Sequence, residues 1–304
     1  MLCERADAKD LAKYEKEYAC ETKLDGTRAF IIKDADGKIS IIGRKRANGH
    51  QSNYAVEHNL PEVEAIANAL PPDSWLDNEL VAFDENGRVN RTLCQRRCST
   101  TSAWKVSALS RQIPVYAYAF DVLRIGGKDL TKVPYFKRKE QLKGLVESLK
   151  LQRLLYLPFA LRGFKEMFDK EQEGVVLKKI WSPYIPKRCS YWVKVKKMAD
   201  EIVTVVGFTN GEGKCEGLFG SLVCVDDEGK YVCNVGGGFT DAERQQLTAI
   251  LRKLEHPLHP RYISEVGDPY TPVKDCPFKL VLTYQEKTEL GHRFAPRMKT
   301  IKYT

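Results

Sequence analysis

The sequence lacks the features that mark membrane, secreted and disulfide-framework proteins. No apolar run approaches the roughly 18–20 residues that a membrane-spanning helix needs. Residues 1–18 mix acidic and basic side chains without an apolar core, so they do not form a secretory signal. The nine cysteines are an odd number and are not densely spaced, which is typical of reduced thiols inside a cell. We therefore expect an intracellular protein, in the cytoplasm or nucleoid, without membrane attachment.

Metal-ligand patterns are also missing. Cys94 and Cys98 are spaced like half of a zinc site, but no second cysteine or histidine pair lies at a suitable spacing. The five histidines form no ligand group. Cys215, Cys224 and Cys233 lie on or beside expected short strands, where a small buried hydrophobe is the usual role of cysteine. The sequence predicts no structural zinc.

What the sequence does contain is a normal globular balance with a basic excess. Hydrophobic residues make up 43% and charged residues 29% of the 304, which argues against wholesale disorder and allows about two domains. The chain carries 49 Lys and Arg against 40 Asp and Glu, a net charge of +9. This excess favours a polyanionic partner only weakly, because many basic proteins bind nothing anionic.

The longer, N-terminal part of the chain has strand and helix patterns. Asp36-Gly37 is a two-residue hairpin signal between two β-rich segments. Residues 54–70 space their apolar side chains at helical intervals and stop at Pro71-Pro72. The expected strands are 18–21, 29–33, 39–43, 75–83, 113–123, 173–180 and 191–197, and the expected helices are 54–70, 137–149 and 162–170.

Beyond residue 200 the pattern changes to short strands separated by glycine-rich turns. Thr240 and Glu243 form a capping box that opens a helix over 241–254. Several short strands with one helix suit a small β-barrel of the OB type. The expected strands here are 202–208, 220–225, 231–235 and 278–285. The domain boundary is placed near Ala199, which gives domains over residues 1–199 and 200–304.

Residues 86–120 hold six basic side chains, no acidic one and a lone tryptophan, Trp104. This composition suits a loop that contacts phosphates, and it equally suits a disordered, solvated loop. The sequence shows no base-reading motif, so any contact with a duplex should tolerate different sequences. The basic residues are Arg88, Arg91, Arg96, Arg97, Lys105 and Arg111.

The strongest chemical signal is the segment Lys23-Leu24-Asp25-Gly26-Thr27-Arg28, which lies between two expected strands. A lysine at a strand edge can act as a nucleophile when nearby cations favour its uncharged amine. The alternative is a surface lysine in a turn. Four more fragments follow in order, each at a strand or strand edge: 76–80, 119–123, 173–178 and 192–196.

In these five fragments the chain resembles the ATP-dependent DNA ligases of the covalent nucleotidyltransferase superfamily, over almost its whole length. The resemblance implies an α+β fold. A nucleotidyltransferase (ATP-grasp-like) domain of antiparallel sheets with flanking helices would be followed by a small OB-fold β-barrel domain. Only 22 residues precede Lys23, so we expect a minimal two-domain form without the large N-terminal DNA-binding domain of bigger ligases.

The resemblance also implies an activity. A monomer would seal nicks in double-stranded DNA with ATP and Mg²⁺ (or Mn²⁺). Lys23 would take AMP from ATP as a lysyl-AMP intermediate, the AMP would pass to the 5′-phosphate of the nick, and the 3′-OH would displace it. The second domain would move between these steps, because one set of side chains serves different groups.

Residues that match the family's nucleotide contacts follow from the same fragments. Lys194 and Lys196 alternate along one strand and would supply positive charge beside Lys23 and the α-phosphate; their alternative is a solvated strand face. Glu21 matches the position that contacts adenine. Phe120 matches an aromatic platform for adenine, with ordinary core packing as the alternative.

Four arginines match family positions near phosphate, which a guanidinium grips with two parallel hydrogen bonds. Arg28 and Arg44 match contacts to the nucleotide and to the 5′-phosphate of the nick, and Arg46 is a rival to Arg44. Arg188 matches another arginine near the nucleotide. In the basic tail, Arg297 is the best match to a residue that orients the pyrophosphate leaving group.

Two acids match metal and sugar contacts. Glu79 matches the acid that accepts from a ribose hydroxyl, and Glu79 and Glu173 together are the candidate metal ligands. Hard carboxylate oxygens that share Mg²⁺ with phosphate oxygens are chemically suited to this.

Three rivals remain open. An mRNA-capping guanylyltransferase shares the lysine motif, but the tail 297–302 lacks the aspartate that such enzymes carry. An RNA ligase would lack the second-domain fragments 220–222 and 238–241, which resemble those of DNA ligases. A non-catalytic nick-binding protein would have lost Lys23 or the paired strand lysines.

Overall fold

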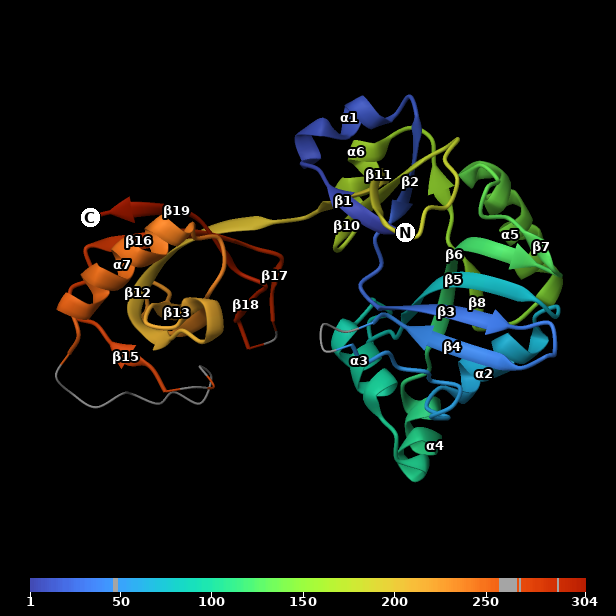
Figure 1. Cartoon of the computed structure of the whole chain (residues 1–304), viewed down its shortest axis with the longest axis horizontal. Coiled ribbons are helices and arrows are strands. Elements are labelled where there is room, and N and C mark those ends of the chain that lie inside the picture. The colour runs from blue at the N-terminus through green and yellow to red at the C-terminus, as the bar shows by residue number, and fades with distance from the viewer. Residues whose placement is uncertain (46–48, 257–266, 268, 289) are drawn as a thin grey trace. The chain divides into compact units, whose positions relative to one another are not determined.

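The computed structural model describes the chain except for residues 46–48, 257–266, 268 and 289. It divides into two compact units, Met1–Lys196 and Lys197–Thr304 (Figure 1). Both combine helices with largely antiparallel sheets, which is the α+β class. Among the described residues, no helix is long and apolar enough to cross a bilayer.

The first unit contains two sheets, which strands from distant parts of the sequence share. Its strands are β1 (Leu2–Arg5), β2 (Tyr18–Thr22), β3 (Thr27–Lys33), β4 (Ile39–Gly43), β5 (Ser74–Val81), β6 (Tyr116–Ile125), β7 (Lys128–Asp129), β8 (Leu154–Tyr156), β9 (Phe159–Ala160), β10 (Gly174–Lys179) and β11 (Arg188–Lys196). The five-stranded sheet has the order β1-β11-β10-β2-β9. The six-stranded sheet runs β4-β3-β5-β6-β7, with β8 beside β6. The β1–β11 and β6–β8 pairs are parallel.

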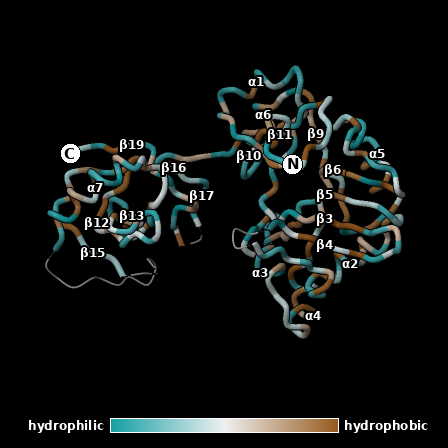
Figure 2. Tube along the Cα trace, in the orientation of Figure 1, coloured by the Kyte–Doolittle hydropathy of each residue, from teal (hydrophilic) through white to brown (hydrophobic). Residues whose placement is uncertain are grey.

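Helices pack against both sheets of this unit. They are α1 (Leu11–Tyr14), α2 (Pro61–Ala69), α3 (Arg91–Ser99), α4 (Ala103–Gln112), α5 (Tyr135–Leu149) and α6 (Phe164–Lys170). Leu11 of α1 and Phe164 of α6 share a core with Val175 and Val193 of the five-stranded sheet. Helices α2 and α5 pack their apolar sides on the six-stranded sheet, through residues such as Val63. Figure 2 shows hydrophobic stretches along these strands.

The expected strands of this unit are confirmed within a few residues. The segment 39–43 matches β4 in full, and the hairpin at Asp36-Gly37 joins it to β3 with Ala29 opposite Gly43. The helices expected at 137–149 and 162–170 are α5 and α6. The sequence analysis did not identify β1, because its four residues are too few to show a period-two pattern.

The helix predicted over 54–70 is wrong in its first half. Helix α2 begins at Pro61, where the missing N–H of proline is harmless in the first turn. Before it the chain makes turns, in which Asn59 donates its backbone N–H to the carbonyl of Tyr54. His58 has a positive φ of 51°, which interrupts any helix. The apolar residues that suggested one helix therefore lie partly in a turn and partly in α2.

The loop predicted over 86–120 is also wrong, because most of it is helical. Asn90 caps α3 by accepting a hydrogen bond from the backbone N–H of Leu93. Cys94 and Cys98, one helical turn apart, are both buried in the core. Charge composition alone misled the prediction, since α3 and α4 are anchored by a few apolar side chains beneath an exposed basic surface.

The second unit is built around one antiparallel sheet and one helix. Its elements are β12 (Ala199–Asn210), β13 (Phe219–Val225), β14 (Tyr231–Val235), α7 (Asp241–Lys253), β15 (Thr271–Pro272), β16 (Phe278–Tyr284), β17 (Glu286–Lys287), β18 (Arg293–Phe294) and β19 (Arg297–Tyr303). The main sheet has the order β14-β13-β12-β16-β19, with β15 beside β12. The predicted capping box is confirmed, because Thr240 and Glu243 each bond the other's backbone N–H. Leu247 and Leu251 of α7 enter the core of this unit.

Arg97 holds three segments of the first unit together, although the sequence analysis assigned it to a phosphate-contacting loop. Its side chain is 0% exposed, and it donates to both oxygens of Glu62 on α2 and to the carbonyl of Asn59. Glu62 also accepts from the backbone N–H of Val115, just before β6. Arg97 is therefore structural rather than a ligand contact.

Arg97→Ala should destabilise the first unit by about 3–5 kcal/mol, because it leaves the Glu62 carboxylate buried without its partner. The neighbouring Arg96 is exposed, so Arg96→Ala should change the free energy of unfolding by less than about 0.5 kcal/mol. Urea unfolding followed by circular dichroism measures both. Equal stability of the two variants would contradict the structural role of Arg97.

Candidate active site

A cavity of about 730 Å³ in the first unit is lined by residues of both sheets. Strands β2, β10 and β11 contribute from one sheet, and β3, β5 and β6 contribute from the other. The fold thus assembles side chains that lie more than a hundred residues apart in the sequence. The predicted site residues that line it are Glu21, Lys23, Arg28, Arg44, Glu79, Phe120, Arg188 and Lys194.

The pleat of the strands sorts side chains between core and cavity. On β10, Val175 packs in the core under α6, whereas its neighbour Val176 and the next alternate residue, Lys178, line the cavity. On β11, the cavity side carries Trp192 and Lys194. Because side chains alternate across a strand, one strand can serve both the core and the site.

Lys23 lies just beyond β2 and is fixed at both ends. Its backbone N–H donates to the carbonyl of Gly174, 3.0 Å away. Its Nζ is 2.6 Å from Oε2 of Glu173, and the side chain remains 19% exposed. Lys196 binds the other oxygen of the same carboxylate, at 2.8 Å. Glu173 and Lys196 are therefore joined to the cavity through Lys23.

Two glycines of the matched fragments are required by close backbone approaches. A Cβ on Gly26 would lie 2.0 Å from the carbonyl oxygen of Leu80. A Cβ on Gly174 would lie 2.1 Å from the carbonyl oxygen of Val195, and its φ of +128° is accessible mainly to glycine. These contacts hold the loop of Lys23 and the start of β10 against neighbouring strands, which sets the Lys23–Glu173 distance.

The amine-rich end of the cavity is suited to an anion. Burial lowers the pKa of Lys194, and the positive charges of Arg5, Lys196 and Lys23 lower it further. Like charges held this close repel one another unless a negative group lies among them. This end can therefore bind a phosphate and stabilise charge that develops on it.

Glu79 has an unusual environment for an acid. It lies on β5 opposite Arg28 of β3, and its carboxyl group has no hydrogen-bond partner in the described part of the chain. Removal from water raises its pKa to about 8, although Lys23 and Arg28 act in the opposite direction. A carboxyl group that is largely protonated at neutral pH is a hydrogen-bond donor as well as an acceptor.

Arg28 is held by protein groups. Its Nε and Nη2 bind the two oxygens of Asp77 at 2.8 and 2.6 Å, and Nη1 donates to the carbonyl of Met1 at 2.6 Å. Burial lowers the pKa of Arg28, but the charge of Asp77 and its hydrogen bonds raise it by more. The guanidinium therefore stays charged. Few donors are left for a ligand, so Arg28 supplies mainly fixed positive charge.

The remaining arginines lie at the exposed rim. Arg44 is exposed and makes no side-chain hydrogen bond or ion pair with any described residue. Arg188 is exposed and donates to the carbonyl of Cys3 on β1. Arg46, the rival to Arg44, lies outside the described residues. Arg44 is thus the more available of these groups for an incoming phosphate.

Phe120 is a cavity residue that is also packed. Its side chain lies against Trp192 in an edge-to-face arrangement, with 5.8 Å between ring centroids, and the residue is 8% exposed. Trp192 is 2% exposed, and its indole N–H has no hydrogen-bond partner among the described groups. A buried donor without a partner is uncommon, and the ring lines the cavity, so a bound acceptor would satisfy it.

The sequence analysis missed several cavity residues. Lys178 lies in the matched fragment 173–178, but the sequence analysis gave it no role. The feature that could have indicated one is a charged residue in an apolar strand, two residues after Val176. Arg91 and Gln95 of α3 line the wall because the supposed loop is a helix. Cys3 comes from β1, which had no sequence signal.

The site has few carboxylates that could bind a hard cation such as Mg²⁺. No group of three or more His, Cys, Asp or Glu suited to a metal occurs in the described residues. Mg²⁺ at phosphate sites usually needs only one or two carboxylates, with waters and substrate oxygens completing the shell. Glu173 and Glu79 fit that requirement, and Glu173 fits it better, because a protonated Glu79 is a weak ligand. The nine cysteines are free thiols.

The family model described as "ATP dependent DNA ligase domain" matches residues 1–196, which include the whole cavity. The chain belongs to the ATP-dependent DNA ligase family. A DNA ligase of Thermococcus fumicolans is 30% identical over 265 residues, covering 82% of this chain and 46% of the relative. DNA ligase 2 of Methanosarcina mazei is 32% identical over 258 residues, covering 79% of this chain and 44% of the relative. The chain therefore spans less than half the length of these relatives.

A solved structure extends this family likeness to the fold. A mycobacterial DNA ligase D complexed with ATP and MES matches with a TM-score of 0.55 at 23% identity. The match covers 100% of this chain and 94% of that one. Both units of this chain thus have counterparts in the fold of that structure.

Glu79→Gln should stabilise the chain in a pH-dependent way. Because the folded pKa is raised, the folded protein keeps a proton between about pH 4.5 and 8 that the unfolded chain releases, so wild-type stability falls as the pH rises through this window. The advantage of Glu79→Gln should be absent below pH 4.5, grow up to pH 8 and then level off.

Urea unfolding of both proteins between pH 4 and 9 measures this difference. The exposed Glu85→Gln is the control and should show no such growth. An advantage of Glu79→Gln that does not change with pH would contradict the proton assigned to Glu79.

Proposed function

We propose that this chain is an ATP-dependent DNA ligase that seals nicks in duplex DNA through a lysyl-AMP intermediate on Lys23. The observation that carries the proposal is the Lys23 amine, 2.6 Å from Glu173 and at the amine-rich end of a cavity large enough for a nucleotide. Family membership and the ATP named with the mycobacterial neighbour support it.

In the first step, the amine nitrogen of Lys23 attacks the α-phosphorus of ATP. A P–N bond forms, the bond to the bridging oxygen breaks, and pyrophosphate leaves. Oε2 of Glu173 is the nearest acceptor for the proton that the amine gives up. Lys194 and Lys196 supply positive charge where negative charge develops on the phosphoryl oxygens.

The next two steps return Lys23 to its starting state. A 5′-phosphate oxygen of the nick attacks the phosphorus of lysyl-AMP, which breaks the P–N bond and forms a pyrophosphate link. The 3′-hydroxyl then attacks the 5′-phosphorus and expels AMP. Arg44 and Arg188 at the rim are the proposed contacts for the 5′-phosphate and nucleotide.

Glu173 and Glu79 are the proposed ligands of a magnesium or manganese ion, which would supply positive charge to offset that of the phosphates. Glu173 bonds the amines of both Lys23 and Lys196, so it lies where such charge is needed.

The base and sugar would occupy the opposite part of the cavity. Phe120 and Val176 offer apolar surfaces from the two sheets for the adenine, and Glu21 also lines the cavity. Glu79 would meet a ribose hydroxyl.

Residues 1–199 would form the nucleotidyltransferase domain and 200–304 an OB-fold domain. Antiparallel order and a single capped helix in the second unit support the OB assignment. Within this unit Lys299 is paired with Asp200, and Arg293 with Glu201, whereas Arg297 is exposed and has no such partner among the described residues. Arg297 therefore stays the proposed pyrophosphate-orienting residue, and the chain is proposed to act as a monomer.

Lys23→Ala should abolish covalent labelling by ATP, because it removes the proposed nucleophile. The variant should still fold, because the Lys23 side chain is partly exposed and Glu173 keeps Lys196 as a partner. Intact mass after incubation with Mg²⁺ and ATP measures the adduct of one AMP. Lys9→Ala, which removes a lysine with a 79% exposed side chain, is the matched control and should label fully.

The same mass measurement separates the rival activities. Labelling by GTP would favour a capping enzyme, and labelling by NAD would remove ATP from the proposal. Wild-type protein, first stripped of bound AMP with pyrophosphate, that gains no nucleotide at all would sink the proposed function. An adduct with ATP followed by sealing of nicked RNA but not nicked DNA would favour an RNA ligase.

Nick binding should depend on the exposed basic surface of α3 and α4. Replacing Arg96 and Arg111 by alanine should weaken binding to nicked DNA. The slope of log binding constant against log salt concentration should fall in magnitude by about one for each phosphate that the variant no longer neutralises. Lys137 and Lys143, exposed on α5, provide a control pair of equal charge. Fluorescence anisotropy at several salt concentrations measures both pairs, and equal slopes would remove α3 and α4 from the DNA surface.

A further inference from the structure

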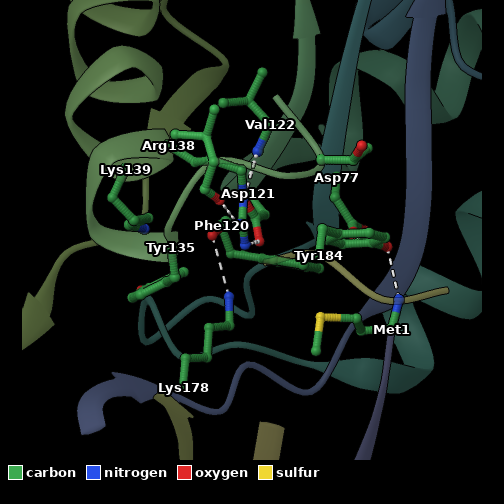
Figure 3. A network of polar contacts seen from close by, with 12 residues as sticks. Met1, Asp77, Phe120, Asp121, Val122, Tyr135, Arg138, Lys139, Lys178 and Tyr184 are labelled. Carbon is green, nitrogen blue, oxygen red and sulfur yellow. Dashed lines mark hydrogen bonds and ion pairs between the residues drawn. The ribbon is translucent and has the colours of Figure 1, made fainter. Parts of the chain in front are cut away.

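Lys178 is a buried lysine in the wall of the cavity, and the proposed chemistry does not use it. The residue is 1% exposed, and its Nζ donates to the carbonyl oxygen of Phe120 at 3.1 Å (Figure 3). The same Nζ is 2.6 Å from Oε2 of Glu21. It also lies 4.4 and 4.3 Å from the ring centroids of Phe120 and Trp192. One ammonium group thus links an acid and two aromatic rings that line the cavity.

The other oxygen of Glu21 has two donors of its own. Oε1 accepts the hydroxyl proton of Tyr135 at 2.6 Å and lies 2.8 Å from Nζ of Lys139. Lys139 itself donates to the carbonyl of Leu157. In Figure 3, Lys139 and Tyr135 lie on the helix side of this network, and Lys178 reaches in from its strand. Glu21 is therefore surrounded by donors on both oxygens.

This arrangement fixes the hydrogen-bonding character of Glu21. An ammonium group has donors only, so the oxygen that faces it acts as an acceptor. A donor at Oε2 would face the donors of Lys178 instead of a matching acceptor, which is unfavourable. The cavity side of Glu21 thus offers acceptors, and it offers a donor only if Lys178 is absent.

We propose that Lys178 is a positioning residue that sets the base choice of the nucleotide site, by holding Glu21 as an acceptor and Phe120 in place beside it. The proposal rests on the proposed function. A purine with an amino group at position 6 donates a hydrogen bond to such an acceptor and therefore binds. A purine with a carbonyl there presents a second acceptor to Glu21 and is rejected.

Lys178 is better suited to this role than Lys139, although both bind Glu21. Lys178 lines the cavity and also bonds the backbone of Phe120, whereas Lys139 does neither. Without Lys139, Oε1 keeps the hydroxyl donor of Tyr135, and Oε2 keeps Lys178. Without Lys178, Oε2 has no donor other than a water or its own proton. Only the second loss allows Glu21 to present a donor to the base.

The test compares ATP with inosine triphosphate, which has a carbonyl at position 6 and lacks the additional 2-amino group of guanine. Pyrophosphate release during formation of the Lys23 adduct gives kcat/KM for each nucleotide. Lys178→Met should lower the ATP-to-ITP ratio by about tenfold or more, chiefly through a higher KM for ATP. Lys178→Arg should restore much of the ratio, and Lys139→Met should change it by less than about threefold.

A folded Lys178→Met protein with the wild-type ratio would overturn the proposal, and so would an equal loss in Lys139→Met. If Lys178→Met does not fold, the paired variant Glu21→Gln with Lys178→Met removes one positive and one negative buried charge and keeps the volume, while Lys139 retains the carbonyl of Leu157. Retention of the wild-type ratio in that pair also overturns the proposal. Absence of any adduct in the wild-type protein is the separate failure of the proposed function.

Discussion

The two-residue period of the strands is the constraint on which the rest of this structure depends. In the five-stranded sheet, one face of β10 and β11 is apolar and lies under α6, and the other face carries Lys178, Trp192 and Lys194 toward the cavity. A shift of one residue in register would exchange the two faces and put lysines into the core. The apolar core under the helices therefore fixes not only the sheet but also the direction of every charged group on it.

Charge placement follows from this arrangement. Groups that are expensive to bury are each paired: Arg28 with Asp77, Arg138 with Asp121, and Glu21 with Lys178 and Lys139. Glu79 has no such partner among the described residues, and its raised pKa favours the protonated form at neutral pH. The site thus combines fully buried, paired charges around Glu21 with partly exposed amines around Lys23. The first kind suits recognition of a base, and the second suits a phosphate that arrives and leaves.

The basic segment shows how composition and position differ. Arg96 and Arg97 are adjacent and chemically identical, yet Arg96 is exposed and Arg97 is wholly buried against Glu62. Charge counting treated both as phosphate contacts. The difference arises because a helix turns about 100° per residue, so consecutive side chains face different environments. A loop assignment contains no such information, and the error in secondary structure became an error in function.

The sequence by itself determined most of the longer strands, the capped helix of the second unit and the cavity residues of the matched fragments. Local periodicity and short motifs carry that information, because strand alternation and capping depend on neighbours in the chain. Only the tertiary structure decided that Lys178 bonds Glu21, that Arg28 is held by Asp77 and that β1 completes the sheet. Each of these depends on contacts between segments more than forty residues apart. No local pattern encodes which distant partner a buried charge will meet, and that partner decides whether the charge supports the fold or faces a ligand.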